Sequence, residues 1–240
     1  MKAWLRFFRV VNLPTVPGDV LVGAAAVFSC ASLTSGRESA SPLVAACVAS
    51  VFLYMFGLAD NDIVGARTDK GRPIPDGQIS LRAARIARGF CLFGVLIVGA
   101  MANLPSMWWI AAFALAVAVV IYNRTKWCLL MGLCRGLNVW CGGFSVCASL
   151  TSGKDSASPL FWLGVCAAVW TIYIAAVTKY SEGEEMDAAK KRRVGFLIGA
   201  IIYLQIIALL LFQSGIVVLL AVVLVVMRLM KRFLPEVSAS

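Results

Sequence analysis

Histidine is absent from this chain, and acidic residues are scarce. The 240 residues include no His and only 12 Asp or Glu, against 22 Lys or Arg. The absence of His excludes His-based catalytic triads, haem ligation by His and the commonest zinc sites. Any acid–base or metal chemistry must therefore come from the few carboxylates.

Other familiar motifs are missing as well. The eight cysteines form no C-x-x-C pair and lie almost entirely in apolar segments, so we interpret them as small core residues. No complete glycine-rich nucleotide motif is present, which leaves ATP-driven function without support. No RNA- or DNA-binding motif is visible either, so the net charge of +10 indicates no nucleic-acid partner. Membrane topology and anionic lipid headgroups account for that charge.

Apolar residues dominate the chain. They make up 61% of it, and the mean hydropathy is +0.88, values typical of a polytopic membrane protein. We expect an all-α transmembrane bundle forming a single domain over residues 1–240, with about eight spans. The predicted spans are residues 13–33, 43–60, 89–103, 106–122, 128–150, 159–178, 194–213 and 215–230.

The positions of the cations predict one orientation in the membrane. With eight spans and a cytoplasmic N terminus, 20 of the 22 Lys and Arg lie on the inner side, and only Arg37 and Lys154 lie outside. Residues 1–12 mix cations with apolar side chains, as a helix lying on the cytoplasmic interface does. We therefore expect a multi-pass protein of the cell membrane, the inner membrane in a bacterium, with both termini in the cytoplasm and membrane lipids around it.

An internal repeat divides the chain. Residues 30–43 recur at 147–160 with twelve identities in fourteen positions and an offset of 117. Four predicted spans separate the copies, so the two halves, residues 13–122 and 123–240, are expected to be parallel four-helix repeats around a central crevice. A recent local copying event is the alternative explanation.

The most informative stretch is the polar segment from Asn61 to Ser80, which follows an apolar span. If the preceding helix continues, Asp62 and Asp69 stand two turns apart on one face, about 10 Å along the axis. Mg²⁺ favours one or two such carboxylates and completes its shell with water and substrate phosphates. A solvated loop punctuated by Pro73 and Pro75 is the alternative.

This stretch resembles the first aspartate-rich motif of the UbiA superfamily of intramembrane prenyltransferases. That motif reads Asn-Asp-x-x-Asp-x-x-x-Asp and is followed by Arg-Pro-Ile/Leu-x-x-Gly-x-Ile/Val-Ser. The matching residues are Asn61, Asp62, Asp69, Arg72, Pro73, Ile74, Gly77, Ile79 and Ser80. Gly65 stands where the family usually has its middle aspartate, so one expected metal ligand is absent.

A second acidic cluster lies where the family has its second motif, typically Asp-x-x-x-Asp. Its carboxylates are Glu182, Glu184, Glu185 and Asp187. The repeat offset carries Gly65 onto Glu182, so the two clusters occupy equivalent places in the two halves. The alternative is an ordinary acidic helix start, with Ser181 and Glu184 in capping-box spacing.

The resemblance implies an Mg²⁺-dependent site for the diphosphate of an isoprenoid donor, with Asp62 and Asp69 as its catalytic residues. The implied metal ligands are Asn61, Asp62, Asp69, Glu182, Glu184, Glu185 and Asp187. The implied substrate-binding residues are Arg67, Arg72, Tyr122, Lys126, Arg135, Asn138 and Lys179. Tyr122 and Lys126 resemble a Tyr-x-x-x-Lys element of the family, although an interfacial Tyr and a snorkelling Lys are common. For Arg135 and Asn138, pairing with an acidic loop is an equal alternative.

The expected reaction moves the isoprenoid group to an aromatic or lipidic acceptor. The altered acidic motifs also fit a divergent branch, such as the prenyltransferase-like protein of the ebo gene cluster, or a protein that binds a prenyl lipid without reacting. A parallel-repeat membrane carrier is the third option. Against a carrier, the charges cluster near the cytoplasmic surface rather than at mid-membrane.

We predict that both termini and both acidic loops face the cytoplasm, because the cations concentrate there. Cysteines introduced at Glu38 and Asp155 should react with an impermeant thiol reagent from outside the cell. Cysteines at Asp62 and Glu185 should react only after the membrane is permeabilised. The reverse labelling pattern would show an inverted topology, with the donor site on the wrong side.

Overall fold

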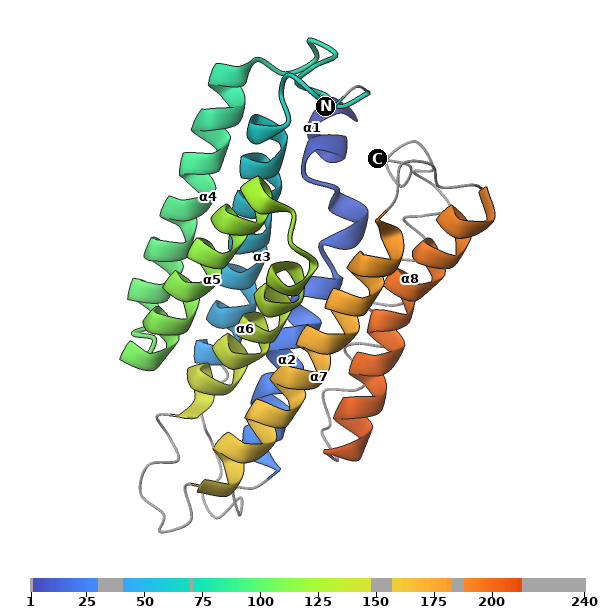
Figure 1. Ribbon diagram of the computed structural model, residues 1–240. Coiled ribbons are helices and arrows are strands. Elements are labelled where there is room, and N and C mark those ends of the chain that lie inside the picture. Colours follow the sequence, from blue (N-terminus) through green and yellow to red (C-terminus); the bar gives the residue numbers. More distant parts are fainter. Residues whose placement is uncertain (1, 30–40, 70, 148–156, 183–187, 213–240) are drawn as a thin grey trace.

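The computed structural model describes residues 2–29, 41–69, 71–147, 157–182 and 188–212 (Figure 1). These residues form helices joined by turns, and no strand occurs among them. The helices are α1 (Lys2–Phe7), the 3-10 turn η1 (Val10–Asn12), α2 (Thr15–Phe28), α3 (Ser41–Val64), α4 (Leu81–Met101), α5 (Ser106–Thr125), α6 (Cys128–Cys147), α7 (Ala157–Ser181) and α8 (Ala188–Leu211).

Six of these helices, α3 to α8, contain segments long and apolar enough to cross a membrane. The expected all-helical membrane bundle is therefore confirmed. The first predicted span is shorter than expected, because α2 has 14 residues and follows η1 and a turn at Pro14. The last predicted span, residues 215–230, lies outside the described residues.

Helices α2 and α6 form the centre of the bundle. Helix α6 packs against α2, α5 and α7, and α2 also contacts α3 and α8. Nearly every residue of α2 is buried, whereas α4, α5, α7 and α8 present large apolar side chains outward, including Phe90, Phe113, Phe161 and Phe196. This distribution suits a bundle whose outer helices face lipid and whose inner helices face only protein.

Two glycines allow α2 and α6 to approach closely. A side chain on Gly23 would run into the carbonyl oxygen of Val139, and one on Gly142 would run into that of Val20. The contact is reciprocal, since each helix places a glycine against the backbone of the other. Small residues of this kind let membrane helices pack backbone to backbone.

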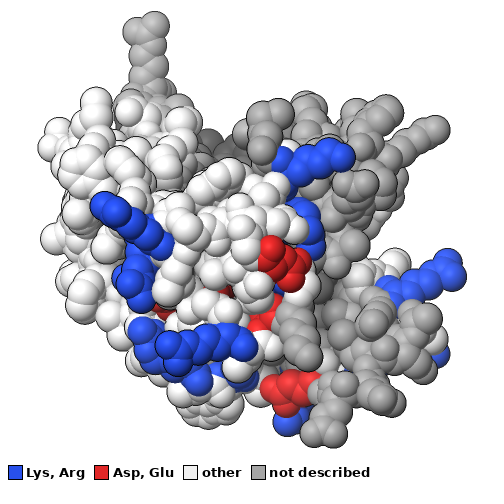
Figure 2. Space-filling model, turned by 90° about the horizontal axis from the view of Figure 1, so that it is seen from above, with Lys and Arg blue, Asp and Glu red and all other residues white. Residues whose placement is uncertain are grey.

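The positions where helices begin can be compared with the internal repeat and with the basic residues of the sequence. Helices α3 and α7 each begin inside one copy of the repeated segment, at Ser41 and Ala157. Helix α4 begins earlier than predicted, because the hydroxyl of Ser80 accepts a hydrogen bond from the backbone N–H of Ala83 at 3.1 Å. The first turns of α4 therefore carry cations. Lys and Arg gather around acidic side chains at the end of the bundle seen in Figure 2.

We predict that Gly142→Ala lowers the free energy of unfolding by about 1–3 kcal/mol, the usual cost of overpacking a tight contact. Thermal unfolding in detergent would measure this. Gly195→Ala on α8 is the matched control, because a Cβ there meets no atom within 4 Å and alanine favours helix. Equal stability of the Gly142→Ala protein and wild type would contradict the close contact between α2 and α6.

Candidate active site

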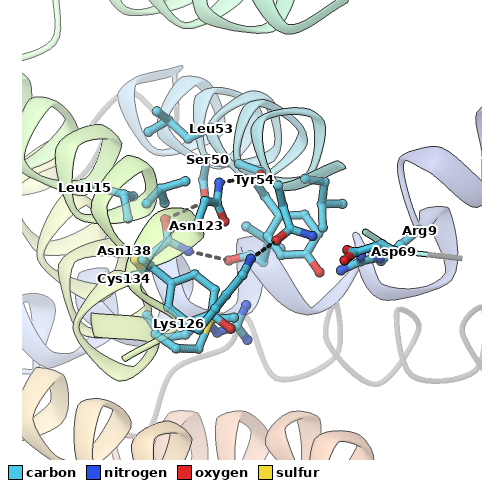
Figure 3. A pocket seen from close by; sticks show the side chains of 18 of the residues that line it. Arg9, Ser50, Leu53, Tyr54, Asp69, Leu115, Asn123, Lys126, Cys134 and Asn138 are labelled. Carbon is cyan, nitrogen blue, oxygen red and sulfur yellow. Dashed lines mark hydrogen bonds between the residues drawn. The ribbon is translucent and has the colours of Figure 1, made fainter. Parts of the chain in front are cut away.

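The described helices enclose a cavity of about 390 Å³ between α2, α3, α5 and α6 (Figure 3). Its walls are largely apolar and include Leu53, Leu58, Leu115, Val119 and Met131. Polar residues lie at two ends, which are separated along α3 by the eleven-residue step from Ser50 to Asn61. At 1.5 Å per residue that step is about 16 Å.

The two ends differ in exposure. At one end the side chains of Arg72 and Asp69 are 33% and 32% exposed. At the other end Ser50 and Asn138 are 2% and 3% exposed. We call the first end the mouth, formed by Arg9, Asn61, Asp69, Arg72 and Lys126, and the second the deep end, formed by Ser50, Arg135 and Asn138.

At the mouth, Arg72 joins the two aspartates of the first acidic motif. Its Nη1 lies 2.5 Å from Oδ1 of Asp62, and its Nε lies 3.2 Å from Oδ2 of Asp69. Helix α3 continues past residue 60 as expected and includes Asp62, but it ends at Val64, and Asp69 follows the turn at residues 65–68. That turn brings both carboxylates to one guanidinium group instead of setting them two turns apart on a helix face.

Two further cations reach the mouth from strained backbone positions. Arg9 has φ 42° and lies with its Nη2 3.4 Å from Oδ1 of Asp62. Lys126 has φ 55°, ends α5, and donates from its ammonium to the side-chain oxygen of Asn61. Non-glycine residues seldom adopt this left-handed conformation, and such strain concentrates at functional sites. The N-terminal segment thus contributes a cation that sequence reasoning had assigned only to an interfacial helix.

Burial affects the charge of Lys126. It lowers the pKa of Lys126 below its ordinary value, while the negative charge of Asp69 opposes that shift. The ammonium also lies 5.5 Å from the centre of the Tyr122 ring, a cation–π contact. Tyr122 and Lys126 therefore lie in contact beside the cavity.

Gly65 has a local structural role. A side chain at this position would collide with the carboxylate of Asp69. The backbone N–H of Asp69 donates to the carbonyl of Gly65 at 2.9 Å, which closes the turn after α3. The small residue at the one departure from the family motif thus gives Asp69 room to reach Arg72.

The described part of the chain brings together no group of three or more His, Cys, Asp or Glu that could hold a metal ion. From the second acidic cluster it includes Glu182, whose carboxylate pairs with Lys179 at 2.7 Å on the exposed surface. Glu184, Glu185 and Asp187 lie outside the described residues. Their predicted role as metal ligands stays a prediction.

The predicted substrate-binding residues divide into two groups. Arg72, Tyr122, Lys126, Arg135 and Asn138 line the cavity. Arg67 and Lys179 are exposed and do not line it. Asp62 is 3% exposed and lies behind Arg9 and Arg72 rather than on the cavity wall.

Sequence reasoning missed two buried aspartates. Asp60 accepts hydrogen bonds from Arg88 at 2.8 Å and Asn123 at 2.9 Å, and Arg124 lies 3.6 Å from it. Asp19, in the middle of α2, pairs with Arg135, with 3.0 Å between Oδ2 and Nε. The available signal for Asp19 was its place as a lone acid within an apolar span, where charge is costly.

The fold defines an integral multi-pass membrane protein with a cavity that opens at a cationic mouth. The model of the UbiA prenyltransferase family matches residues 20–234, and the chain belongs to that family. A solved structure of a digeranylgeranylglyceryl phosphate synthase is similar in fold, with 14% sequence identity and a TM-score of 0.55. That similarity covers 100% of this chain and 91% of the other. No curated protein matches the sequence.

We predict that Lys126→Gln weakens binding of inorganic pyrophosphate at the mouth about 10- to 100-fold, the usual worth of a hydrogen bond to a charged group. Titration calorimetry on the purified protein would measure it. Undiminished affinity in a folded Lys126→Gln protein would show that the ammonium does not contact the anion.

The same experiment has a pH dependence with a definite sign. Only the charged ammonium binds the anion, and burial lowers its pKa, so affinity should fall as the pH rises through that lowered value. Lys126→Arg should lose this component, because guanidinium stays protonated. Pyrophosphate titrates in the same way with both proteins, so the difference between their affinities does not include its titration.

Proposed function

We propose that this protein is a prenyltransferase that moves an isoprenoid group from a prenyl diphosphate to an aromatic or lipidic acceptor within the membrane. The observation that carries the proposal is the cavity, which combines a cationic mouth with an apolar body. A diphosphate suits the mouth, since Arg9, Arg72 and Lys126 offer charge-assisted hydrogen bonds. An isoprenoid chain suits the apolar walls.

The mouth also fits one Mg²⁺ ion. The hydrogen bonds that Asp62 accepts from described residues, given by Arg9, Asn61 and Arg72, all end on Oδ1. Its other oxygen thus stays available, and Asp69 offers a second carboxylate beside the same guanidinium. Asn61, Asp62 and Asp69 would hold the ion, in keeping with the one or two carboxylates that Mg²⁺ favours. When bound, the metal would stabilise the departing diphosphate.

The chain's own residues bind and orient the donor. Arg72 and Lys126 contact the phosphate oxygens and neutralise their charge, and Arg9 adds a third cation from the N-terminal segment. The apolar walls of α3 and α5 exclude water from the isoprenoid carbon that becomes electron-poor as its bond to diphosphate breaks. The acceptor reaches that carbon from within the cavity.

The test is transfer from labelled geranylgeranyl diphosphate in reconstituted membranes, measured as release of diphosphate and labelling of extractable lipid. Wild type should release diphosphate only with Mg²⁺ present. The Asp62→Ala/Asp69→Ala protein should insert normally and lose the Mg²⁺-dependent part of binding and release, because both proposed carboxylate ligands are gone. Asp76→Ala is the matched control, since Asp76 is an exposed acid of the same loop that does not line the cavity.

Other outcomes identify other functions. Mg²⁺-dependent binding without release of diphosphate would indicate a protein that holds a prenyl lipid without reacting. Movement of an intact labelled lipid between membrane leaflets would indicate a carrier. Undiminished Mg²⁺ dependence in the Asp62→Ala/Asp69→Ala protein would exclude these two residues as the metal site.

A further inference from the structure

The deep end of the cavity contains a buried ion pair that the proposed donor site does not use. Asp19 on α2 is 0% exposed, and its Oδ2 lies 3.0 Å from Nε of Arg135 on α6. The side chain of Arg135 is 12% exposed and lines the cavity. Asp19 itself does not line the cavity and stands behind the arginine.

The hydrogen-bond and ion-pair partners of Asp19 among the described residues are all donors. Asn138 donates to Oδ2 at 3.2 Å, while Trp170 and Gln205 donate to Oδ1 at 2.9 and 2.8 Å. Together with Arg135, these partners satisfy an ionised carboxylate. The charge of Asp19 therefore cancels that of Arg135.

Stability alone does not account for this pair. A buried ion pair is often no more stabilising than apolar residues of the same volume, because both charges lose their hydration. Here the arginine stands on the cavity wall, and donors from α6, α7 and α8 converge on its counter-ion. The arrangement keeps the guanidinium group of Arg135 on the cavity wall, while the carboxylate of Asp19 neutralises its charge.

The neighbouring groups leave the deep end polar but uncharged. Ser50 donates to the side-chain oxygen of Asn138 at 2.6 Å, and the amide of Asn138 donates to the carbonyl of Val16 at 3.0 Å (Figure 3). The mouth differs, because among the described residues the three cations Arg9, Arg72 and Lys126 face the two carboxylates of Asp62 and Asp69. An anion is thus attracted to the mouth, whereas the charge of Arg135 at the deep end is balanced by Asp19.

We propose that Asp19 is a positioning residue that neutralises Arg135, so that the cavity selects acceptors whose inner end is an uncharged hydrogen-bonding group, such as a hydroxyl or carbonyl. Acceptors with a carboxylate or phosphate at that end are rejected, because Asp19 already balances the guanidinium charge of Arg135. The choice of acceptor rests on the proposed transferase function, whereas the neutrality of the deep end is independent of that function.

Cys134 gives a direct probe of that neutrality. It lines the cavity next to Arg135, so the other seven cysteines are replaced by alanine and its reaction with thiosulfonates is followed by mass spectrometry. The measured quantity is the ratio of its rates with an anionic sulfonatoethyl reagent and a cationic trimethylammonioethyl reagent. Because the mouth cations are the same in every variant, changes in the ratio report the deep end.

The expected ratios form a double-mutant cycle. Asp19→Asn exposes the charge of Arg135 and should raise the ratio of anionic to cationic reagent at least tenfold. Arg135→Gln leaves the buried carboxylate without its cation, so the carboxylate takes up a proton and the ratio should stay close to that of wild type. The Asp19→Asn/Arg135→Gln protein should return to the wild-type ratio, since both have a neutral deep end.

Asp60→Asn is the matched control, because it also removes a buried, arginine-paired carboxylate, but its partners Arg88 and Arg124 do not line the cavity, whereas Arg135 does. Its ratio should equal that of wild type. If Asp19→Asn does not fold, the comparison of wild type with the double variant still decides the question. A wild-type ratio well above that of the double variant would overturn the proposal.

A second measurement tests acceptor choice. In the transfer assay, wild type should prefer the methyl ester of 4-hydroxybenzoate over 4-hydroxybenzoate itself at least tenfold, and Asp19→Asn should reduce or reverse that preference. An equal preference in both proteins would overturn the role of Asp19 in selection. Failure of transfer with every acceptor would count against the proposed function, while the cysteine ratios would still stand.

Discussion

A carboxylate buried among apolar helices needs a cation beside it, and this constraint organises the inner part of the protein. Removing a charged group from water costs several kcal/mol unless a partner and hydrogen bonds replace its hydration. Asp19, Asp60 and Asp62 are each 3% exposed or less, and each pairs with at least one arginine from another segment. These pairs set which helices and loops must lie together around the cavity.

Three consecutive residues near the end of α3 show how this works. Successive side chains on a helix point about 100° apart, so neighbours in sequence serve different surroundings. Asp60 turns to Arg88 on α4 and Arg124 at the end of α5, while Asn61 faces Lys126 across the cavity. Asp62 turns to Arg9 and Arg72. One short polar segment thereby connects α4, α5, the N-terminal segment and the following loop.

The cavity lies between two polar clusters with different charge. At the mouth, cations outnumber the carboxylates of Asp62 and Asp69, which suits a diphosphate donor. At the deep end, Asp19 balances Arg135, which suits an uncharged acceptor group. The two clusters share α3, and α6 supplies Arg135 and Asn138 to the deep end, so a change in how these helices pack would alter the cavity. The glycine contact between α2 and α6 is therefore important to the site as well as to stability.

By itself the sequence determined that this is an all-helical membrane protein, where seven of its helices lie and which loop carries the aspartates, because hydropathy and turn signals are local properties. The tertiary structure decided which charges meet. Gln205 and Asp19 are 186 residues apart in the chain, yet their side chains lie 2.8 Å apart. Arg9 reaches the mouth because its backbone turns left-handed between α1 and α2. Such contacts depend on how the helices pack against one another, and no local sequence pattern predicts this packing.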